Sequence, residues 1–414
     1  MNRPLSMRLA AMAALGTSVA VAGLTAEKEQ DWRRQIKATL FVPDPLPALA
    51  PQTHGRFEPA PGVIAERVTY GTQFGMRVPA VLYLPKSRSG KVPAFIVVNG
   101  HGGDKYSWYA FYSGILYARA GAAVLTYDPA GEGERNIDRK SGTRAHDKVE
   151  PPRELAQRLG GLMITDVMQA VSYLSQRPEV DPQRIAAAGY SMGSFVLSLA
   201  CAVETRLKAC VLVGGGNLDG PGEYWDKSKP MCQGIPYQSL MFLGDRPAAL
   251  YALHAARGAT LVYNGLEDNT VHIPPNAPEF FRDLQRRVAA LRGSAEGVFD
   301  TGFVPGVGHR PFFVTKPVAL WLERQLDFPN WTEESIQAME ETHIGAWAKE
   351  NGVEMDKLYA SEHREGGARA LSTGVPALSR QDLSVFSPPE WERRKARMIH
   401  EEWLKQAKAL IVPR

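Results

Sequence analysis

The chain has 414 residues, 44% hydrophobic and 22% charged, which is the composition of an ordinary globular protein long enough for one large α/β domain with extensions. Its formal net charge of +4 includes no basic run of the kind that binds nucleic acid or an anionic membrane. The three cysteines, Cys201, Cys210 and Cys232, are too few for a disulfide scaffold, and the first two fall in segments expected to be buried.

Residues 1–26 form a separate unit at the start of the chain. Arg3 and Arg8 precede an apolar run over residues 9–24, and a charged stretch begins at Glu27. This pattern is typical of a secretory signal peptide, which predicts export to the periplasm or the exterior. The run is shorter than the roughly 20 residues of a membrane span, so cleavage is favoured over retention as an anchor.

The predicted elements follow a Pro-rich segment, residues 27–62, which we expect to form an irregular arm on the surface. Strands over residues 63–70 and 76–84 flank a glycine-containing turn, which predicts an antiparallel hairpin. Beyond the hairpin, predicted strands and helices alternate. The strands cover residues 93–99, 122–127, 185–189, 210–213, 260–264 and 297–303. The helices cover residues 106–119, 153–176, 194–203, 278–291 and 316–326.

This alternation predicts an α/β fold: a mostly parallel, doubly wound sheet with helices on both faces and an antiparallel N-terminal edge. We assign the catalytic domain to residues 63–330. Residues 214–258 contain no clear strand and are candidates for a cap or lid. Residues 331–414 contain amphipathic segments over 332–348 and 389–410 with spaced tryptophans, which predict a helical C-terminal extension packed on the core.

The pentapeptide Gly189-Tyr190-Ser191-Met192-Gly193 fits the pattern Gly-x-Ser-x-Gly between a predicted strand and a predicted helix. That context is what the nucleophile elbow of a hydrolase requires. The glycines let the strand and the helix approach closely, and the turn presents the serine hydroxyl at the edge of the sheet. We therefore predict Ser191 as a covalent nucleophile and the Met192 N–H as one donor of the oxyanion hole.

A serine hydroxyl becomes a nucleophile when a base takes its proton, and an acid must orient that base. His309, in a loop rich in glycine and proline after the last predicted strand, is the expected base. Asp268, just after the strand over 260–264, is the expected acid, with Glu267 as the nearest alternative. His272 is a poor base candidate, because it lies on the same loop only four positions beyond the acid.

The second donor of the oxyanion hole is expected in the glycine-rich loop after the strand over residues 93–99. Glycine lets the main chain approach a substrate oxygen, so Gly103 or Gly102 is the expected donor, and His101 is expected to shape the loop. Residues 128–135 lack the ending of a phosphate-binding loop and are interpreted as a pocket wall. No grouping of His, Cys and acidic residues has metal-ligand spacing, so we expect neither a metal nor another cofactor.

These residues resemble the α/β-hydrolase superfamily, whose order of elements residues 63–326 follow. The segment Arg-Pro-Glu-Val-Asp-Pro-Gln-Arg-Ile over 177–185, leading into the Ser191 pentapeptide, is similar to one branch of it. That branch holds acetyl xylan esterases, dienelactone-hydrolase-like proteins and catalytic domains of the prolyl-oligopeptidase type. The resemblance implies a triad of Ser191, Asp268 and His309, with an oxyanion hole at Gly103 and Met192. It also implies acyl transfer to water without a cofactor.

Three departures from the branch affect the expected activity. Ser194 stands where many members have a second glycine after the elbow. The residues before Val63 are too few for the β-propeller of the oligopeptidases, and the nucleophile is a serine rather than the cysteine of the dienelactone hydrolases. Esterase is therefore favoured over peptidase.

The expected function is that of a secreted serine hydrolase of carboxylic esters, with acetylated carbohydrate as a candidate substrate. The expected partner is a small-molecule or carbohydrate ester, with no nucleic acid and no membrane after signal cleavage. A serine oligopeptidase or aminopeptidase is the first alternative. A non-catalytic α/β-hydrolase that only binds its ligand is the second.

Overall fold

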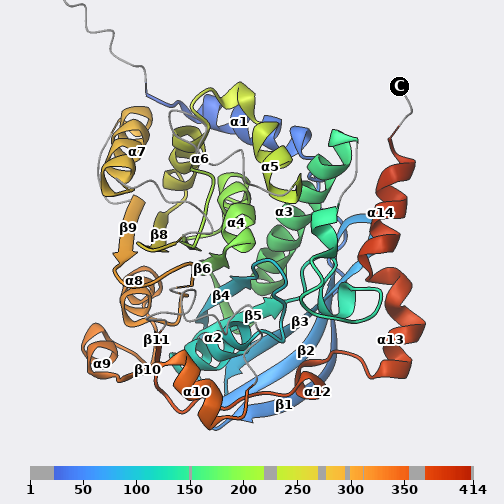
Figure 1. Ribbon diagram of the computed structural model, residues 1–414, viewed down its shortest axis with the longest axis vertical. Helices are drawn as coiled ribbons and strands as arrows, with labels where there is room; N and C mark the ends of the chain where they lie inside the picture. Colours follow the sequence, from blue (N-terminus) through green and yellow to red (C-terminus); the bar gives the residue numbers. More distant parts are fainter. Residues whose placement is uncertain are drawn as a thin grey trace, which may run out of the picture.

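A nine-stranded sheet runs through the molecule in the order β1-β2-β3-β5-β4-β6-β7-β8-β9 (Figure 1). The computed structural model describes residues 23–148, 152–218, 231–268, 277–293, 299–310, 312–353 and 369–411. The strands β1, β2, β3 and β5 pair antiparallel, and every neighbouring pair from β5 to β9 is parallel. The predicted mostly parallel sheet with an antiparallel N-terminal edge is confirmed.

The strands and helices have the following bounds. The strands of the large sheet are β1 Gln52–Ala60, β2 Val63–Gly71, β3 Arg77–Pro85, β4 Val92–Val98, β5 Ala123–Tyr127, β6 Val180–Tyr190, β7 Ala209–Val213, β8 Ala259–Gly265 and β9 Phe299–Val304. The helices up to the end of the predicted catalytic domain are α1 Ala26–Thr39, α2 Trp108–Arg119, α3 Arg153–Ser175, α4 Met192–Val203, α5 Met231–Gln238, α6 Arg246–Ala255, α7 Ala277–Arg292 and α8 Lys316–Leu326. The later elements are α9 Glu333–Ala338, β10 Glu341–His343, α10 Ile344–Glu350, β11 Arg369–Leu371, α12 Arg380–Leu383, α13 Pro388–Arg394 and α14 His400–Ala409.

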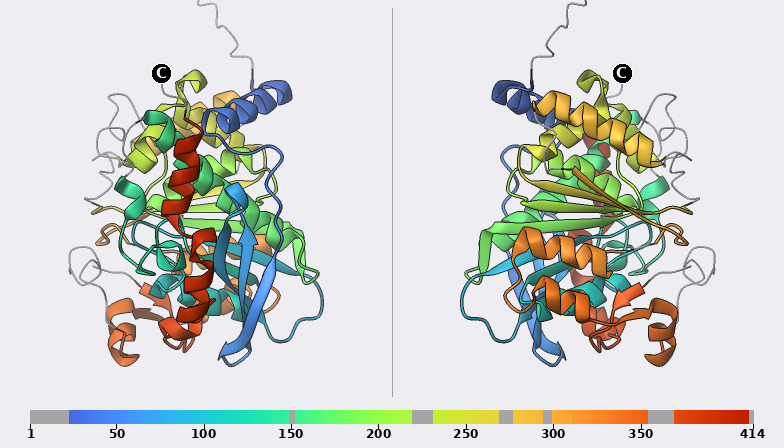
Figure 2. Two further views of the ribbon diagram at one scale, coloured as in Figure 1. Left: turned by 90° about the vertical axis from the view of Figure 1, so that its right-hand side faces the viewer. Right: turned by 90° about the vertical axis from the view of Figure 1, so that its left-hand side faces the viewer.

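Two layers of helices cover the sheet. The helices α1, α3, α4, α6 and α7 pack on one face, and α2 and α8 pack on the other (Figures 1 and 2). Every residue of β4, β5, β7 and β8 is buried, as expected for parallel strands that are covered on both faces. The short, continuously apolar runs in the sequence arise from this double burial.

The N-terminal segment differs from the irregular arm that its prolines predict. Helix α1 is capped by Thr25, whose side chain accepts a hydrogen bond from the Lys28 N–H, and it buries Trp32 and Ile36 against the core. Strand β1 then pairs with β2 and extends the sheet by one edge strand. Prolines are compatible with this arrangement because most of them lie between the two elements, and an edge strand tolerates proline.

The predicted helical C-terminal extension is present, but its helices are shorter than the sequence pattern suggests. The stretch over 332–348 is divided into α9, β10 and α10, because β10 pairs antiparallel with β11. The stretch over 389–410 is divided into α13, a 3₁₀ turn over Lys395–Arg397 and α14. All four tryptophans of the extension are buried, as predicted: Trp331, Trp347, Trp391 and Trp403.

The extension is joined to the sheet domain by hydrogen bonds of buried groups. The Glu134 carboxylate accepts the N–H groups of Val385 at 2.9 Å and Phe386 at 3.0 Å. The indole N–H of Trp391 donates to the Glu134 carbonyl oxygen at 2.9 Å, and that of Trp403 donates to Gln73 Oε1 at 3.2 Å. The helices α13 and α14 therefore lie along the edge of the sheet domain (Figure 1).

The candidate cap, residues 214–258, is described in part. Helix α6 packs between α4 and α7 within the helix layer, so this part is not a separate lid. Residues 219–230 lie outside the described residues, as do residues 1–22, which hold most of the predicted signal peptide. No helix in the described part of the chain is long and apolar enough to cross a membrane.

Candidate active site

Ser191 occupies a sharp turn between β6 and α4. Its φ of 51° and ψ of −115° are unfavourable for a residue with a side chain, as the nucleophile elbow requires. A Cβ atom on Gly189 would lie 2.3 Å from the Gly193 carbonyl oxygen, and one on Gly193 would lie 2.1 Å from the Val98 carbonyl oxygen. Both glycines of the pentapeptide are therefore needed for the close contact between strand and helix.

The structure brings Ser191, His309 and Asp268 into one hydrogen-bonded chain. His309 Nε2 lies 2.8 Å from Ser191 Oγ, and His309 Nδ1 lies 2.8 Å from Asp268 Oδ2. The two side chains that follow β8 and β9, Asp268 and His309, are buried. The imidazole thus bonds the hydroxyl at one nitrogen and the carboxylate at the other, which is the arrangement of a serine triad.

Glu267, the alternative acid, points elsewhere. Its side chain is exposed, and Oε1 accepts the Gly306 N–H at 3.1 Å, which braces the loop that carries His309. The structure therefore places Asp268 rather than Glu267 against the imidazole. His272 lies outside the described residues.

Three residues that the sequence did not single out shape the surroundings of the His309 ring. Gly214 adopts a positive φ of 61°, and a Cβ atom there would lie 3.2 Å from the ring. The ring of Tyr190 lies 5.5 Å from that of His309, centroid to centroid. Arg310 Nε donates to the Tyr190 hydroxyl at 2.7 Å and fixes that ring in turn. In the sequence, the only signals for these residues are that Tyr190 lies inside the pentapeptide and that Arg310 follows His309.

The expected oxyanion donors differ in availability. Met192 is the first residue of α4, where an N–H group has no acceptor within the helix. The Gly103 N–H donates to the Gly100 carbonyl oxygen at 3.0 Å and closes a turn, so Gly103 is the less suitable second donor. Gly102, with a φ of 74°, and His101 make no backbone N–H bond within the described ranges.

His101 and Ser194 are not part of the hydrogen-bonded chain. Burial lowers the pKa of His101, and this effect outweighs the raising effect of Asp147, so its imidazole is neutral at pH 7. The Ser194 hydroxyl donates to the Ser191 carbonyl oxygen at 2.6 Å and is fully buried. Ser194 therefore stabilises the first turn of α4, where a glycine could not do so.

The loop interpreted as a pocket wall is built on buried charges. Lys105 Nζ pairs with the carboxylates of Asp128 and Glu134, and all three side chains are fully buried. Burial alone would lower the pKa of Lys105, but the two carboxylates raise it, so the ammonium stays charged. These groups fix the loop that follows β5 to the loop that follows β4.

Two protein families match this chain. The prolyl oligopeptidase family (Peptidase_S9) matches residues 152–336, and the acetyl xylan esterase family (AXE1) matches residues 56–213. Between them the matches include the serine, the carboxylate and the imidazole of the hydrogen-bonded chain. They support the prediction of an enzyme that hydrolyses ester bonds.

Individual relatives are distant. The uncharacterized protein PA2218 of Pseudomonas aeruginosa is 28% identical over 204 residues, which are 49% of this chain and 47% of that protein. Among solved structures, methylesterase BT1017 is 20% identical with a TM-score of 0.62, over 92% of this chain and 74% of the other. The acetyl xylan esterase from Paenibacillus sp. R4 is 20% identical with a TM-score of 0.52, over 73% and 96%. The chain has the α/β-hydrolase fold and is similar to the branch that contains the acetyl xylan esterases and the catalytic domains of prolyl oligopeptidases.

Proposed function

We propose that this protein hydrolyses carboxylic esters through a covalent acyl-enzyme at Ser191. The observation that carries the proposal is the position of His309, whose two ring nitrogens lie 2.8 Å from Ser191 Oγ and from Asp268 Oδ2. A neutral imidazole in this position accepts the serine proton at Nε2, while the buried carboxylate holds the Nδ1 proton.

The reaction proceeds in two halves. Ser191 Oγ attacks the ester carbonyl as its proton passes to His309, and the negative oxygen is stabilised by the Met192 N–H and by an N–H of the loop after β4. The imidazolium then protonates the leaving alcohol, and the acyl group remains on Ser191. Water, deprotonated by His309, attacks the acyl-enzyme; the imidazolium then returns the proton to Ser191 Oγ as the bond to the acyl group breaks and the acid leaves.

The substrate we propose is an ester of a carbohydrate. The acetyl xylan esterase family matches the part of the sheet from β1 to β7, and two of the neighbours in fold are a methylesterase and an acetyl xylan esterase. An acetylated sugar is therefore the first candidate. The match to the prolyl oligopeptidase family over 152–336 keeps a peptidase as the second candidate.

Hydrolysis of p-nitrophenyl acetate beside an amino-acid p-nitroanilide tests the proposal. We expect ester turnover by the wild type, loss of that turnover in Ser191→Ala, and no loss in the control Ser172→Ala, whose hydroxyl bonds its own helix at Met168. Amide turnover of similar efficiency would replace the esterase by the peptidase. No turnover of either substrate in a folded protein would favour a binding protein.

Export is a separate proposal that rests on the sequence of residues 1–26. Expression with a culture fractionation and N-terminal sequencing of the product tests it. A mature chain that starts near residue 27 outside the cytoplasm would support export with cleavage. A product that keeps Met1 in the cytoplasm would contradict it.

A further inference from the structure

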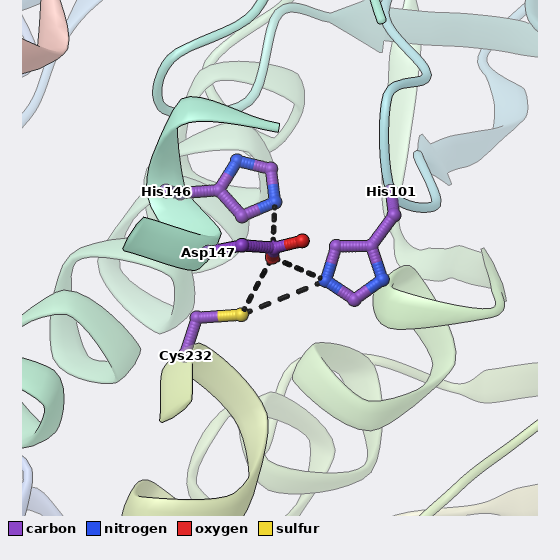
Figure 3. Close-up of side chains that lie close together, drawn as sticks. All are labelled: His101, His146, Asp147 and Cys232. Atoms are coloured by element: carbon purple, nitrogen blue, oxygen red, sulfur yellow. Dashed lines mark hydrogen bonds and ion pairs between the residues drawn. The ribbon is translucent and has the colours of Figure 1, made fainter. Parts of the chain in front are cut away.

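Four side chains from distant parts of the chain converge in one place: His101, His146, Asp147 and Cys232, hereafter the His101 cluster (Figure 3). His101 lies in the loop after β4. His146 and Asp147 lie in a 3₁₀ turn over Ala145–Lys148, and Cys232 lies in α5. One nitrogen, oxygen or sulfur atom of each lies within 4.8 Å of the others.

The other three side chains gather around one carboxylate oxygen of Asp147 (Figure 3). Asp147 Oδ1 lies 2.8 Å from His101 Nε2 and 3.2 Å from Cys232 Sγ, and it lies 3.5 Å from His146 Nε2. Cys232 Sγ is also 3.6 Å from His101 Nε2 (Figure 3). Two imidazoles, one carboxylate and one thiol form a donor set of the kind that binds Zn²⁺ in tetrahedral sites.

The orientation of His146 is an independent sign of a ligand. Its Nδ1–H donates to the Ala130 carbonyl oxygen at 2.9 Å, which fixes the tautomer and leaves the lone pair on Nε2. The ring is fully buried, and Nε2 has no hydrogen-bond partner among the described residues. A buried nitrogen that faces a carboxylate without a proton between them is unfavourable, and a cation at the centre removes this conflict.

The carboxylate is oriented in the same manner. Arg144 Nε donates to Asp147 Oδ2 at 2.6 Å, so Oδ1 is the oxygen that faces the other three side chains. Hydrogen bonds of this type from outside a metal site hold its ligands in place. Both His146 and Asp147 thus have one atom bonded outward and one atom directed inward.

A second cluster of possible ligands differs from the His101 cluster, because its polar atoms already have partners within the protein. Cys201, Cys210 and His254 also lie close together and are buried. However, both nitrogens of His254 are engaged, Nε2 by the Ser198 carbonyl oxygen at 2.7 Å and Nδ1 by Thr260 Oγ1 at 3.0 Å. The Arg257 guanidinium donates to Cys210 Sγ at 2.6 Å and already supplies a positive charge.

We propose that the His101 cluster is a structural Zn²⁺ site. The ligands are Nε2 of His101 and of His146, a carboxylate oxygen of Asp147 and the thiolate of Cys232. When the zinc–sulfur bond forms, the thiol proton leaves to solvent. The Nε2 proton of His101 is replaced by one on Nδ1, so that this ring stays neutral. The ion joins the loop after β4, the 3₁₀ turn and α5.

Metal content and affinity test the proposal on the full chain. The purified protein is stripped with EDTA, titrated with ZnCl₂ against a competing chelator, and analysed for zinc after gel filtration. We expect one zinc ion per chain in the wild type, as four ligands imply. Cys232→Ser and His146→Gln should each weaken binding by about tenfold or more. The matched control Cys201→Ala should bind as the wild type does.

Binding of Co²⁺ can be measured on the wild type itself, so this test does not require that a variant folds. Co²⁺ added to the stripped wild type should produce the absorption band of a cobalt–thiolate bond, and Cys232→Ser should lack it. A wild type that retains no zinc and shows no thiolate band would overturn the proposal. Equal zinc affinity in the wild type, Cys232→Ser and His146→Gln would overturn it too. Neither measurement needs a substrate, so the result is independent of the proposed esterase activity.

Discussion

Two regions of this molecule contain the same kinds of side chain in different geometries. The Ser191 chain and the His101 cluster each combine an imidazole, a carboxylate and an O–H or S–H group. In the first, hydroxyl and carboxylate bond opposite nitrogens of His309, each at 2.8 Å. In the second, the carboxylate of Asp147 and the sulfur of Cys232 both approach Nε2 of His101.

The difference separates two chemical uses of histidine. A ring that is hydrogen-bonded at both nitrogens can accept the hydroxyl proton at one nitrogen while the carboxylate holds the proton on the other. When several possible metal ligands lie close to the same ring nitrogen, a cation can bind between them. The residue types alone do not distinguish a proton-transfer site from a metal site. The distinction is whether the partners lie at opposite ring nitrogens or at the same one. The following predictions test this distinction, beginning with the largest effect.

Ser191→Ala should separate the two regions most clearly. We expect ester turnover to fall by roughly a thousandfold to a millionfold, because the nucleophile is lost, and zinc content to stay unchanged. Rates and metal analysis on the same preparation measure both. Residual activity above about a thousandth of the wild type would count against Ser191 as nucleophile.

Asp268→Asn should reduce kcat by roughly ten-thousandfold, because an amide cannot hold the productive tautomer of His309. The matched variant is Glu267→Gln, one position away, which should change kcat little since Glu267 only braces the Gly306 loop. Steady-state kinetics on both variants decide the matter. The reverse ranking would assign the acid to Glu267.

Zinc should stabilise the fold without taking part in the proton transfer. A ligand that binds only the folded state, at a free concentration about 100 times its Kd, increases the free energy of unfolding by about 2.7 kcal/mol. We expect the Tm of the stripped wild type and of Cys201→Ala to rise by a few degrees on addition of ZnCl₂. The Tm of Cys232→Ser should not rise. An equal rise in all three proteins would contradict the assignment of Cys232 as a ligand.

His400 supplies a histidine that belongs to neither region. Burial lowers its pKa to about 3, and both ring nitrogens lack a hydrogen-bond partner within the described part of the chain. The unfolded chain binds a proton near pH 6.5 that the folded chain rejects until about pH 3, so stability falls as the pH decreases through this window.

The expected slope from His400 is about 1.4 kcal/mol per pH unit. His400→Phe should flatten the unfolding free energy between pH 6 and pH 4, as measured by urea titration at each pH. Esterase activity at pH 7 should stay near that of the wild type, since His400 lies in the C-terminal helix α14. An unchanged slope would show that His400 is not the group that titrates.

The parts of the structure that could be predicted are those with a local signal. The Ser191 elbow combines a sequence pattern, a buried strand and a following helix, and β4 to β8 each have an apolar run at the expected place. Asp268 and His309 could be assigned because each directly follows such a strand. Helix α8 begins and ends where its pattern predicts, at Lys316 and Leu326.

The remaining features depend on contacts between distant segments. Strand β1 forms because β2 offers a free edge, which a Pro-rich composition does not reveal. The preference for Gly103 overlooked the turn in which its N–H is already used. The His101 cluster has no spacing motif, because its four members come from three segments that meet only in the folded protein.

The hydrogen bonds between Glu134 and the extension join segments that leave the ribosome at different times. Glu134 leaves the ribosome about 250 residues before Val385 and Phe386, whose N–H groups its carboxylate accepts. Until that later segment emerges, the carboxylate that neutralises Lys105 lacks two of its donors. The loop over residues 128–135 therefore gains these two hydrogen bonds only after Ser191, Asp268 and His309 have been synthesised. A nascent chain that already contains these three residues still lacks the segment near residue 385 that anchors Glu134.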